Sequence, residues 1–193
     1  MKRSLLFAMG ALLGGALLFT SCGKDDEKTE DPDVRDAAVG NYTGTTTYYW
    51  ATDEGMEADE ETFGKPNSIN GSVEKDAEQL SAIRLAFDGD VFYGNKIAAA
   101  SNGFTFDIEP QTVEDVKVTG YNVAKLGTAE YNGMFLSDDK TLTFGMKISI
   151  EDFIDLFFDE EDEDSWIIAL AIAAVADEEG IDYVVVKYDL TKR

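Results

Sequence analysis

Apolar and polar residues alternate with a period of two along most of residues 39–148. In residues 39–50, Tyr42, Tyr48 and Trp50 fall on one face, and three threonines fall on the other. Period-two alternation of β-branched and aromatic residues is typical of a strand that buries one face. This stretch therefore predicts a strand with an aromatic inner face.

The same alternation predicts a series of strands at short and even spacing. Asp88-Gly89 and Asn102-Gly103 are turn dipeptides that favour positive φ, and each joins two alternating runs. Residues 51–66 are acidic and irregular, and we expect a long loop there. Strands spaced in this way favour an all-β sandwich or barrel. The further predicted strands are residues 69–74, 80–87, 91–99, 104–109, 116–123, 128–135, 141–148 and 181–190.

Helical spacing replaces the alternation at about residues 150–179. Ser149 is a candidate N-cap with Asp152 three residues later, which is a partial capping box. Apolar residues then repeat with the period of one helix face: Ile150, Phe153, Ile154 and Phe157. We therefore expect a first short helix directly after the strand at residues 141–148.

A second helix is predicted from the apolar run at residues 166–176, which Gly180 follows as a C′ glycine. Eleven apolar residues are too few to span a bilayer. A helix that is apolar all round must be covered on more than one side. Ala169, Ala173 and Ala176 share a face and predict a shallow groove for close packing against the sheet or the preceding helix.

The first 21 residues have the pattern of a secretory signal. Lys2 and Arg3 precede an uncharged apolar stretch at residues 5–19, which is too short for a comfortable bilayer span. Small residues lead into Cys22, the only cysteine of the chain, so no internal disulfide can form. This arrangement resembles the lipobox of bacterial lipoproteins, which implies cleavage before Cys22 and acylation of its thiol.

The residues after Cys22 are acidic and include Asp25, Asp26 and Glu27. Such a run resembles the surface-export signal of lipoproteins of the Bacteroidota, which implies an outward-facing position on the outer membrane. The alternative is an acidic linker that only keeps a tether solvated. Residues 22–36 have too few apolar side chains to fold, so we expect a flexible tether there and one domain at residues 37–193.

The chain carries a formal charge of −23, and loss of Lys2 and Arg3 with the signal makes it more negative still. This charge repels phosphate backbones, so we expect no nucleic-acid partner. The chain has no histidine, and its single thiol is the expected lipid site, which excludes catalytic triads and cysteine chemistry. We therefore expect a protein that is not an enzyme and that has no cofactor.

Two groups of residues are candidate binding sites. Tyr42, Tyr48 and Trp50 are candidates to line a barrel mouth and stack on a sugar or an apolar ligand, and core packing is the alternative. The acidic run at residues 159–164 offers oxygen ligands of the kind that Ca²⁺ prefers. It lacks the spacing of an EF-hand loop, so we favour a solvated loop and expect no metal site.

Three short motifs follow one another in this chain: Gly40-Asn-Tyr42-Thr-Gly44, Tyr131-Asn-Gly133 and Leu142-Thr-Phe144. Together with the lipobox they resemble the calycin-like, lipocalin-like β-barrel lipoproteins of the Bacteroidota. The resemblance covers about residues 39–190. It implies a mainly β fold, an antiparallel meander that forms a small barrel or half-barrel, with the helical pair at about 150–179 inserted before the last strand.

These features lead to one principal hypothesis and two alternatives. The principal one is a surface-anchored, noncatalytic binding or accessory lipoprotein whose ligand is a small apolar molecule, a glycan or a partner protein. The first alternative is a structural subunit of an envelope complex that docks through its apolar helices. The weaker alternative is a carboxylate-dependent hydrolase. An open, partly polar barrel interior favours ligand binding, whereas a filled barrel with an exposed apolar patch favours docking.

Overall fold

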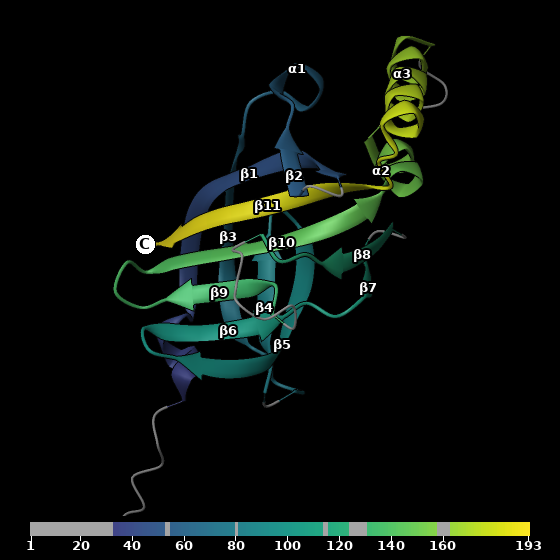
Figure 1. Ribbon diagram of the computed structural model, residues 1–193. Helices are drawn as coiled ribbons and strands as arrows, with labels where there is room; N and C mark the ends of the chain where they lie inside the picture. Colours follow the sequence, from purple (N-terminus) through teal and green to yellow (C-terminus); the bar gives the residue numbers. More distant parts are fainter. Residues whose placement is uncertain (1–32, 53–54, 80, 114–115, 124–130, 158–162) are drawn as a thin grey trace, which may run out of the picture. The chain divides into compact units, whose positions relative to one another are not determined.

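Eight antiparallel strands close into a barrel in the computed structural model, which describes residues 33–52, 55–79, 81–113, 116–123, 131–157 and 163–193 (Figure 1). Each barrel strand pairs with the next one along the chain, and the last pairs with the first. The barrel strands are β1 (Gly40–Thr52), β3 (Asn67–Lys75), β4 (Ile83–Phe87), β5 (Asp90–Ala100), β6 (Gly103–Asp107), β9 (Gly133–Leu136), β10 (Thr141–Ser149) and β11 (Tyr183–Lys192).

Three shorter strands extend this barrel at its margins. β2 (Gly55–Ala58) forms a hairpin with β1, while β8 (Val116–Gly120) pairs with β10 beyond the end of β9. β7 (Gln111–Val113) in turn pairs with β8. The sequence pattern does not predict β7, because three residues are too few to show a period.

The seam between β1 and β11 closes the barrel. Ten residue pairs join the two strands in continuous antiparallel register, from Tyr42 opposite Lys192 to Ala51 opposite Tyr183. β11 is paired with β10 along its other edge. Closure removes the exposed strand edges that a half-barrel would leave. The choice between barrel and half-barrel is therefore decided in favour of a barrel.

The core lies inside the barrel and follows the alternation that the sequence predicts. In β4, Ile83, Leu85 and Phe87 are buried and the residues between them are half-buried. Val184, Val185 and Val186 of β11 are all buried, so this strand is covered on both faces. Within the described residues, the predicted strands are found with shifts of a few residues at their ends, because strand pairing rather than local propensity sets where each strand ends. Residue 80 and residues 128–130 of the predicted strands lie outside the described residues.

The expected loop at residues 51–66 is wrong in its described part, which forms β2 and the short helix α1 (Glu60–Phe63). Asp59 caps α1 by accepting hydrogen bonds from the backbone N–H groups of Glu61 and Thr62, and it also accepts one from Trp50 Nε1 at 3.1 Å. Hydrogen bonds from Thr62 and Trp50 lower the pKa of Asp59. Long-range contacts, which no local pattern records, thus fold this acidic segment onto the barrel.

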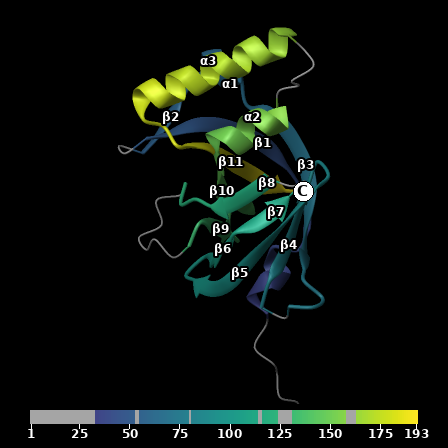
Figure 2. The ribbon, with the colours of Figure 1, turned by 90° about the vertical axis from the view of Figure 1, so that its right-hand side faces the viewer.

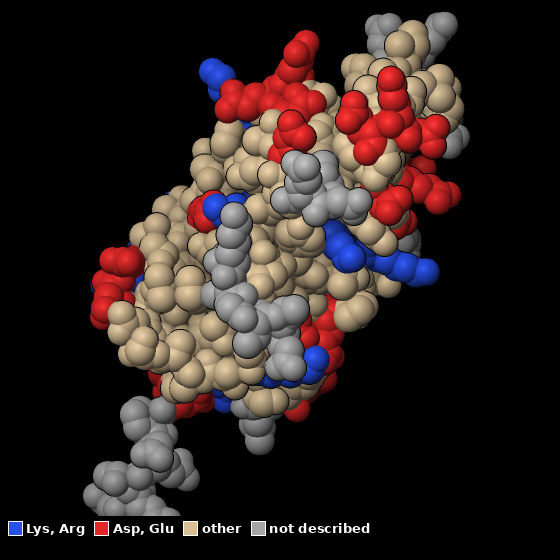
Figure 3. All heavy atoms as spheres, in the orientation of Figure 1, with Lys and Arg blue, Asp and Glu red and all other residues tan. Residues whose placement is uncertain are grey.

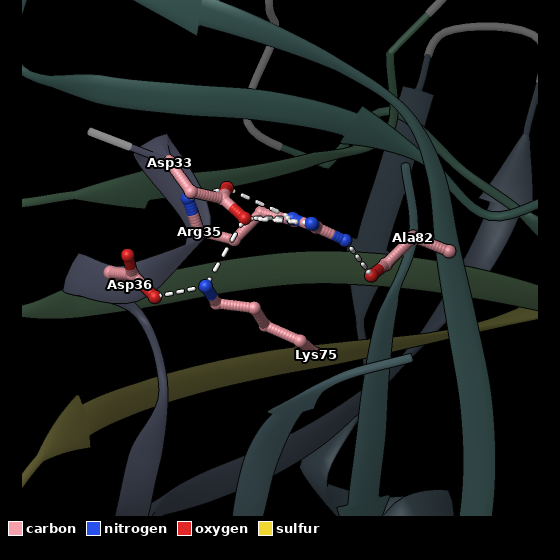
Figure 4. A network of polar contacts seen from close by, with 5 residues as sticks. All are labelled: Asp33, Arg35, Asp36, Lys75 and Ala82. Atoms are coloured by element: carbon pink, nitrogen blue, oxygen red, sulfur yellow. Dashed lines mark hydrogen bonds and ion pairs between the residues drawn. The ribbon is translucent and has the colours of Figure 1, made fainter. Parts of the chain in front are cut away.

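The chain enters the barrel through an ordered turn of 3-10 helix, η1 (Val34–Ala37), held by the polar network in Figure 4. Asp33 caps this turn and forms an ion pair of 2.7 Å with Arg35, whose guanidinium also donates to the carbonyl oxygen of Ala82 at 3.0 Å. Lys75 of β3 pairs with both Asp33 and Asp36. The folded domain therefore includes residues 33–36, which the sequence pattern predicts as part of the tether.

Replacement of Asp33 by asparagine is expected to lower the free energy of unfolding by about 1–3 kcal/mol at pH 7, because charge-assisted hydrogen bonds are lost. Hydrogen bonds from Arg35 hold the pKa of Asp33 well below its usual range. A carboxyl group with a lowered folded-state pKa stabilises the fold above the unfolded pKa, about 3.9, and less and less below it.

Urea unfolding of the parent and the Asp33→Asn variant at pH 7 and at pH 3 tests this effect. The difference between the two proteins should shrink at pH 3. Asp138→Asn in the exposed turn between β9 and β10 is the matched control for loss of one surface charge. A difference for Asp33→Asn that is the same at both pH values would contradict the proposed role of the ion pair.

Candidate functional site

Large aromatic side chains fill the interior of the barrel. The ring of Phe144 stacks on the ring of Tyr188 with centroids 4.3 Å apart, and the rings of Phe87, Phe92 and Phe106 surround this pair. A cavity of about 70 Å³ remains beside Tyr188 and Met146. Ligand pockets are typically about 300–1,000 Å³, so this space has the size for a few waters at most.

Tyr42, Tyr48 and Trp50, the three aromatic residues predicted to line a ligand site, are spread along β1 and are buried or half-buried. Tyr42 is buried near the start of β1 and donates a hydrogen bond to the carbonyl oxygen of Ala38 at 2.7 Å, and burial raises its pKa. Trp50, near the other end of β1, is buried with its ring 4.5 Å from the ring of Phe63. Tyr48 is half-buried and also faces Phe63. The structure thus buries Tyr42 and packs Tyr48 and Trp50 against Phe63.

The other candidate groups fall outside what the structure describes. Cys22 and residues 159–162 lie outside the described residues, and so do the side chains of Glu163 and Asp164. Among the side chains that are described, no three acidic, histidine or cysteine residues are arranged to hold a metal ion.

As the sequence predicts, a pair of helices lies between β10 and β11: α2 (Ile150–Phe157) and α3 (Glu163–Glu179). Whether this pair caps the barrel was left open by the sequence, and Figure 2 shows both helices at one end of the strands. Ser149 caps α2, since its hydroxyl accepts from the backbone N–H of Asp152 at 3.0 Å and donates to the carboxylate of that residue at 2.6 Å. Phe153 is buried in the core, and Ile150 and Ile154 pack against it. No described helix has the length and apolar character needed to cross a membrane.

α3 rests on the rest of the domain through one narrow side. Ala169, Ile172 and Ala176 are buried, and Ala173 is half-buried beside them. This confirms the groove of small residues predicted from the sequence. The expectation that α3 is covered on more than one side is wrong for the described structure, because the opposite side of the helix is exposed.

The exposed side of α3 carries large apolar side chains. Ile167 is 59 % exposed, and Leu170 is 52 % exposed. Trp166, Ile168 and Val175 are also among the exposed large apolar residues. Side chains of this size and exposure together present an apolar patch on the order of several hundred Å², the size at which a patch on a soluble protein marks an interaction site.

A cleft of about 610 Å³ lies between α2, α3 and the adjoining ends of β10 and β11. Its lining combines apolar side chains with carboxylates. The apolar lining residues include Ile150, Ile154, Trp166, Ala173, Ala176 and Ile181, and the acidic ones are Glu151, Asp155, Asp177 and Asp182. A second hollow of about 370 Å³ lies between Val175 of α3 and Trp50 of β1. The cap thus offers the concave surface that the barrel interior lacks.

Acidic side chains surround this cap. Residues 148–186 contain no lysine or arginine. Their described acidic side chains are Glu151, Asp152, Asp155, Asp177, Glu178, Glu179 and Asp182. In Figure 3 red side chains gather around α2 and α3 on the face that is shown. An apolar helix beside carboxylates is complementary to a group that is both apolar and positively charged.

Sequence reasoning identified α3 as apolar and missed the concave surface beside it. The available signal was the contrast between the uncharged residues 166–176 and the three consecutive acids that follow, Asp177, Glu178 and Glu179. The cleft itself has no signal in the sequence, because it is formed by segments that only the tertiary structure brings together.

Comparison of the chain with protein-family models, with curated proteins and with solved structures finds no match. The class of protein is therefore defined by its own geometry: a closed eight-stranded antiparallel barrel with a filled interior and an apolar, acid-rimmed helical cap.

Proposed function

We propose that this protein is a noncatalytic binding or accessory lipoprotein, anchored to the outer membrane through Cys22 and facing outward, with a calycin-like barrel as scaffold. The helical cap is its recognition surface. The observation that carries the proposal is the contrast between the two candidate cavities: about 70 Å³ inside the barrel and about 610 Å³ in the cap cleft. The cap cleft has the size of a typical binding site, whereas the space inside the barrel does not.

The direction of the chain supports an anchor at one end and recognition at the other. β1 begins opposite the end of β11, where Tyr42 pairs with Lys192, while the cap joins the end of β10 to the start of β11. η1 and the ion pairs of Asp33 therefore lie at the end of the barrel away from α2 and α3 (Figure 1). An anchor ahead of η1 therefore joins the domain at the end of the barrel that lies away from the cap.

A second candidate function is a structural subunit of an envelope complex. The exposed apolar side of α3 is the observation that favours it, because permanent interfaces are more apolar than transient ones. The two candidates differ in how long the partner stays bound. A structural subunit copurifies from the envelope in fixed stoichiometry, whereas an accessory protein is isolated alone and binds reversibly.

The anchor is tested on the full chain expressed with its own signal. We expect mass spectrometry to find the N-terminal peptide beginning at Cys22 with a diacylglyceryl thioether, and protease added to intact cells to release the domain. Cys22→Ser is expected to remove the acyl mass and to free the chain from the membrane fraction. Native protein with an unmodified Cys22 thiol would overturn the anchor.

A further inference from the structure

α3 has a second apolar side that is built like a helix-packing surface. Its residues repeat at the i, i+3, i+4 and i+7 spacing of a single stripe: Ile167, Leu170, Ala171 and Ala174. All four are exposed in the described structure. This outer stripe lies opposite the buried residues of the same helix. The large side chains of Ile167 and Leu170 form ridges on the helix surface. The small side chains of Ala171 and Ala174 allow the backbone of a facing helix to come close.

The charges at the end of α3 point to the kind of partner. Asp177, Glu178 and Glu179 occupy the last turn, which contains no basic residue. The C-terminal end of a helix carries the negative end of its dipole, so acids there oppose helix formation. These three carboxylates therefore do not serve the stability of α3 itself. A cation brought to this end by a partner offsets both their charge and the dipole.

The cleft beside α3, like the helix itself, combines carboxylates with apolar side chains. Glu151 and Asp155 of α2 line it together with Asp177 and Asp182, next to the indole of Trp166. A lysine or arginine of a helix lying on the outer stripe can reach these carboxylates with its long side chain, and an exposed indole attracts a cation over its face.

Charge also decides against the two other ways of covering the outer stripe. A second copy of this chain would bring its own acidic cap against this one, because residues 148–186 contain no lysine or arginine. An anionic membrane surface would be repelled in the same way.

We infer that the outer stripe of α3 and the adjoining cleft bind an amphipathic, positively charged helix of a partner protein. Its apolar face lies on Ile167, Leu170, Ala171 and Ala174, and its lysines or arginines pair with the carboxylates of the cap. The stretch from Trp166 to Val175 is about 15 Å long at 1.5 Å per residue, so a partner helix of three to four turns covers it. This inference rests on the cap as recognition surface and does not depend on the lipid anchor.

The test uses residues 22–193 with Cys22→Ser, so that no acyl chain competes for the apolar surface. The probe is a synthetic 14-residue helix of leucine and lysine with all leucines on one face. Two control peptides replace lysine by glutamate or scramble the order so that no leucine face forms. Titration calorimetry is expected to show one-to-one binding of the first peptide alone, weakened by added salt.

Two double variants locate the site. Ile167→Ser with Leu170→Ser removes the apolar contact, and Asp177→Asn with Glu178→Gln removes charge at the end of α3. Each is expected to weaken binding at least about tenfold. Asp138→Asn with Asp139→Asn is the matched charge control in the exposed turn at the opposite end of the barrel, and it should leave affinity unchanged. Unchanged thermal midpoints show that all variants fold.

Four results would overturn the inference. The first is binding of the leucine–lysine peptide that neither double variant weakens, and the second is equal binding of the glutamate peptide. The third is sedimentation that shows a dimer abolished by Ile167→Ser with Leu170→Ser. The fourth is a parent protein that binds phosphatidylcholine vesicles but not the leucine–lysine peptide, together with loss of vesicle binding in Ile167→Ser with Leu170→Ser. None of these results depends on whether Cys22 carries an acyl group, which is measured separately from the mass of the N-terminal peptide. Failure of this inference is therefore distinct from failure of the anchor.

Discussion

Replacement of Gly44 by alanine is expected to prevent the barrel from closing. Gly44 of β1 lies opposite Leu190 of β11, and a Cβ atom added to it would overlap the carbonyl oxygen of Asp189 and stand 2.8 Å from the Cα of Leu190. These are backbone atoms, which cannot move aside as a flexible side chain does. The strands at the closing seam must separate, with loss of hydrogen bonds on both sides of the variant position.

We expect Gly44→Ala to lower the free energy of unfolding by roughly 4 kcal/mol or more, a size that single changes reach only through a defined mechanism of this kind. The melting temperature should fall by roughly 10 °C for a domain of this length. Gly89→Ala is the control, because Gly89 has a φ of +107° and nothing within 4 Å of an added Cβ. That change should cost only the backbone strain of about 1–2 kcal/mol. Equal losses at the two positions would refute the steric explanation.

Replacement of Phe144 by alanine is expected to cost about 3–5 kcal/mol of unfolding free energy, the range for large aromatic truncations in a core. Phe144 is fully buried and contacts the rings of Tyr188, Phe87, Phe92 and Phe106. Its loss removes the stack with Tyr188 and leaves a cavity at the centre of the barrel. Urea unfolding followed by tryptophan fluorescence measures the change.

Two further variants make the Phe144 result specific. Phe144→Leu retains much of the volume and should cost less than Phe144→Ala. Ile167→Ala also shortens a large apolar side chain, but Ile167 is 59 % exposed and its loss should change stability by about 0.5 kcal/mol or less. If the barrel interior is a ligand site rather than a core, Phe144→Ala should leave stability nearly unchanged, which would contradict the filled barrel.

The local pattern of the chain was sufficient for most of the fold. The alternation in residues 83–87 and 141–149 predicts strands with one buried face, and both are found as β4 and β10. The cap of α2 at Ser149 and the glycine after α3, Gly180 with φ of +66°, are likewise local signals that the structure confirms. Each of these features depends on neighbours within a few residues, and for that reason a single sequence predicts them.

The candidate site was predicted less well. Aromatic residues on a strand are compatible with a ligand platform and with a core, and no local pattern distinguishes the two for Tyr42 and Trp50. The decision came from partners distant in sequence: Phe63 on α1 covers Trp50, and Asp59 accepts its indole N–H. The segment that carries both of these partners was expected to be a loop.

By itself, the sequence determined that the domain is rich in strands and that a helical pair precedes the last strand. It also determined that the uncharged residues 166–176 are followed by the acidic residues 177–179. Only the tertiary structure decided that β1 pairs with β11, that the barrel is filled and that one side of α3 remains exposed. The physical reason is that periodicity shows which residues of an element share a face, whereas burial of that face depends on which distant segments reach it.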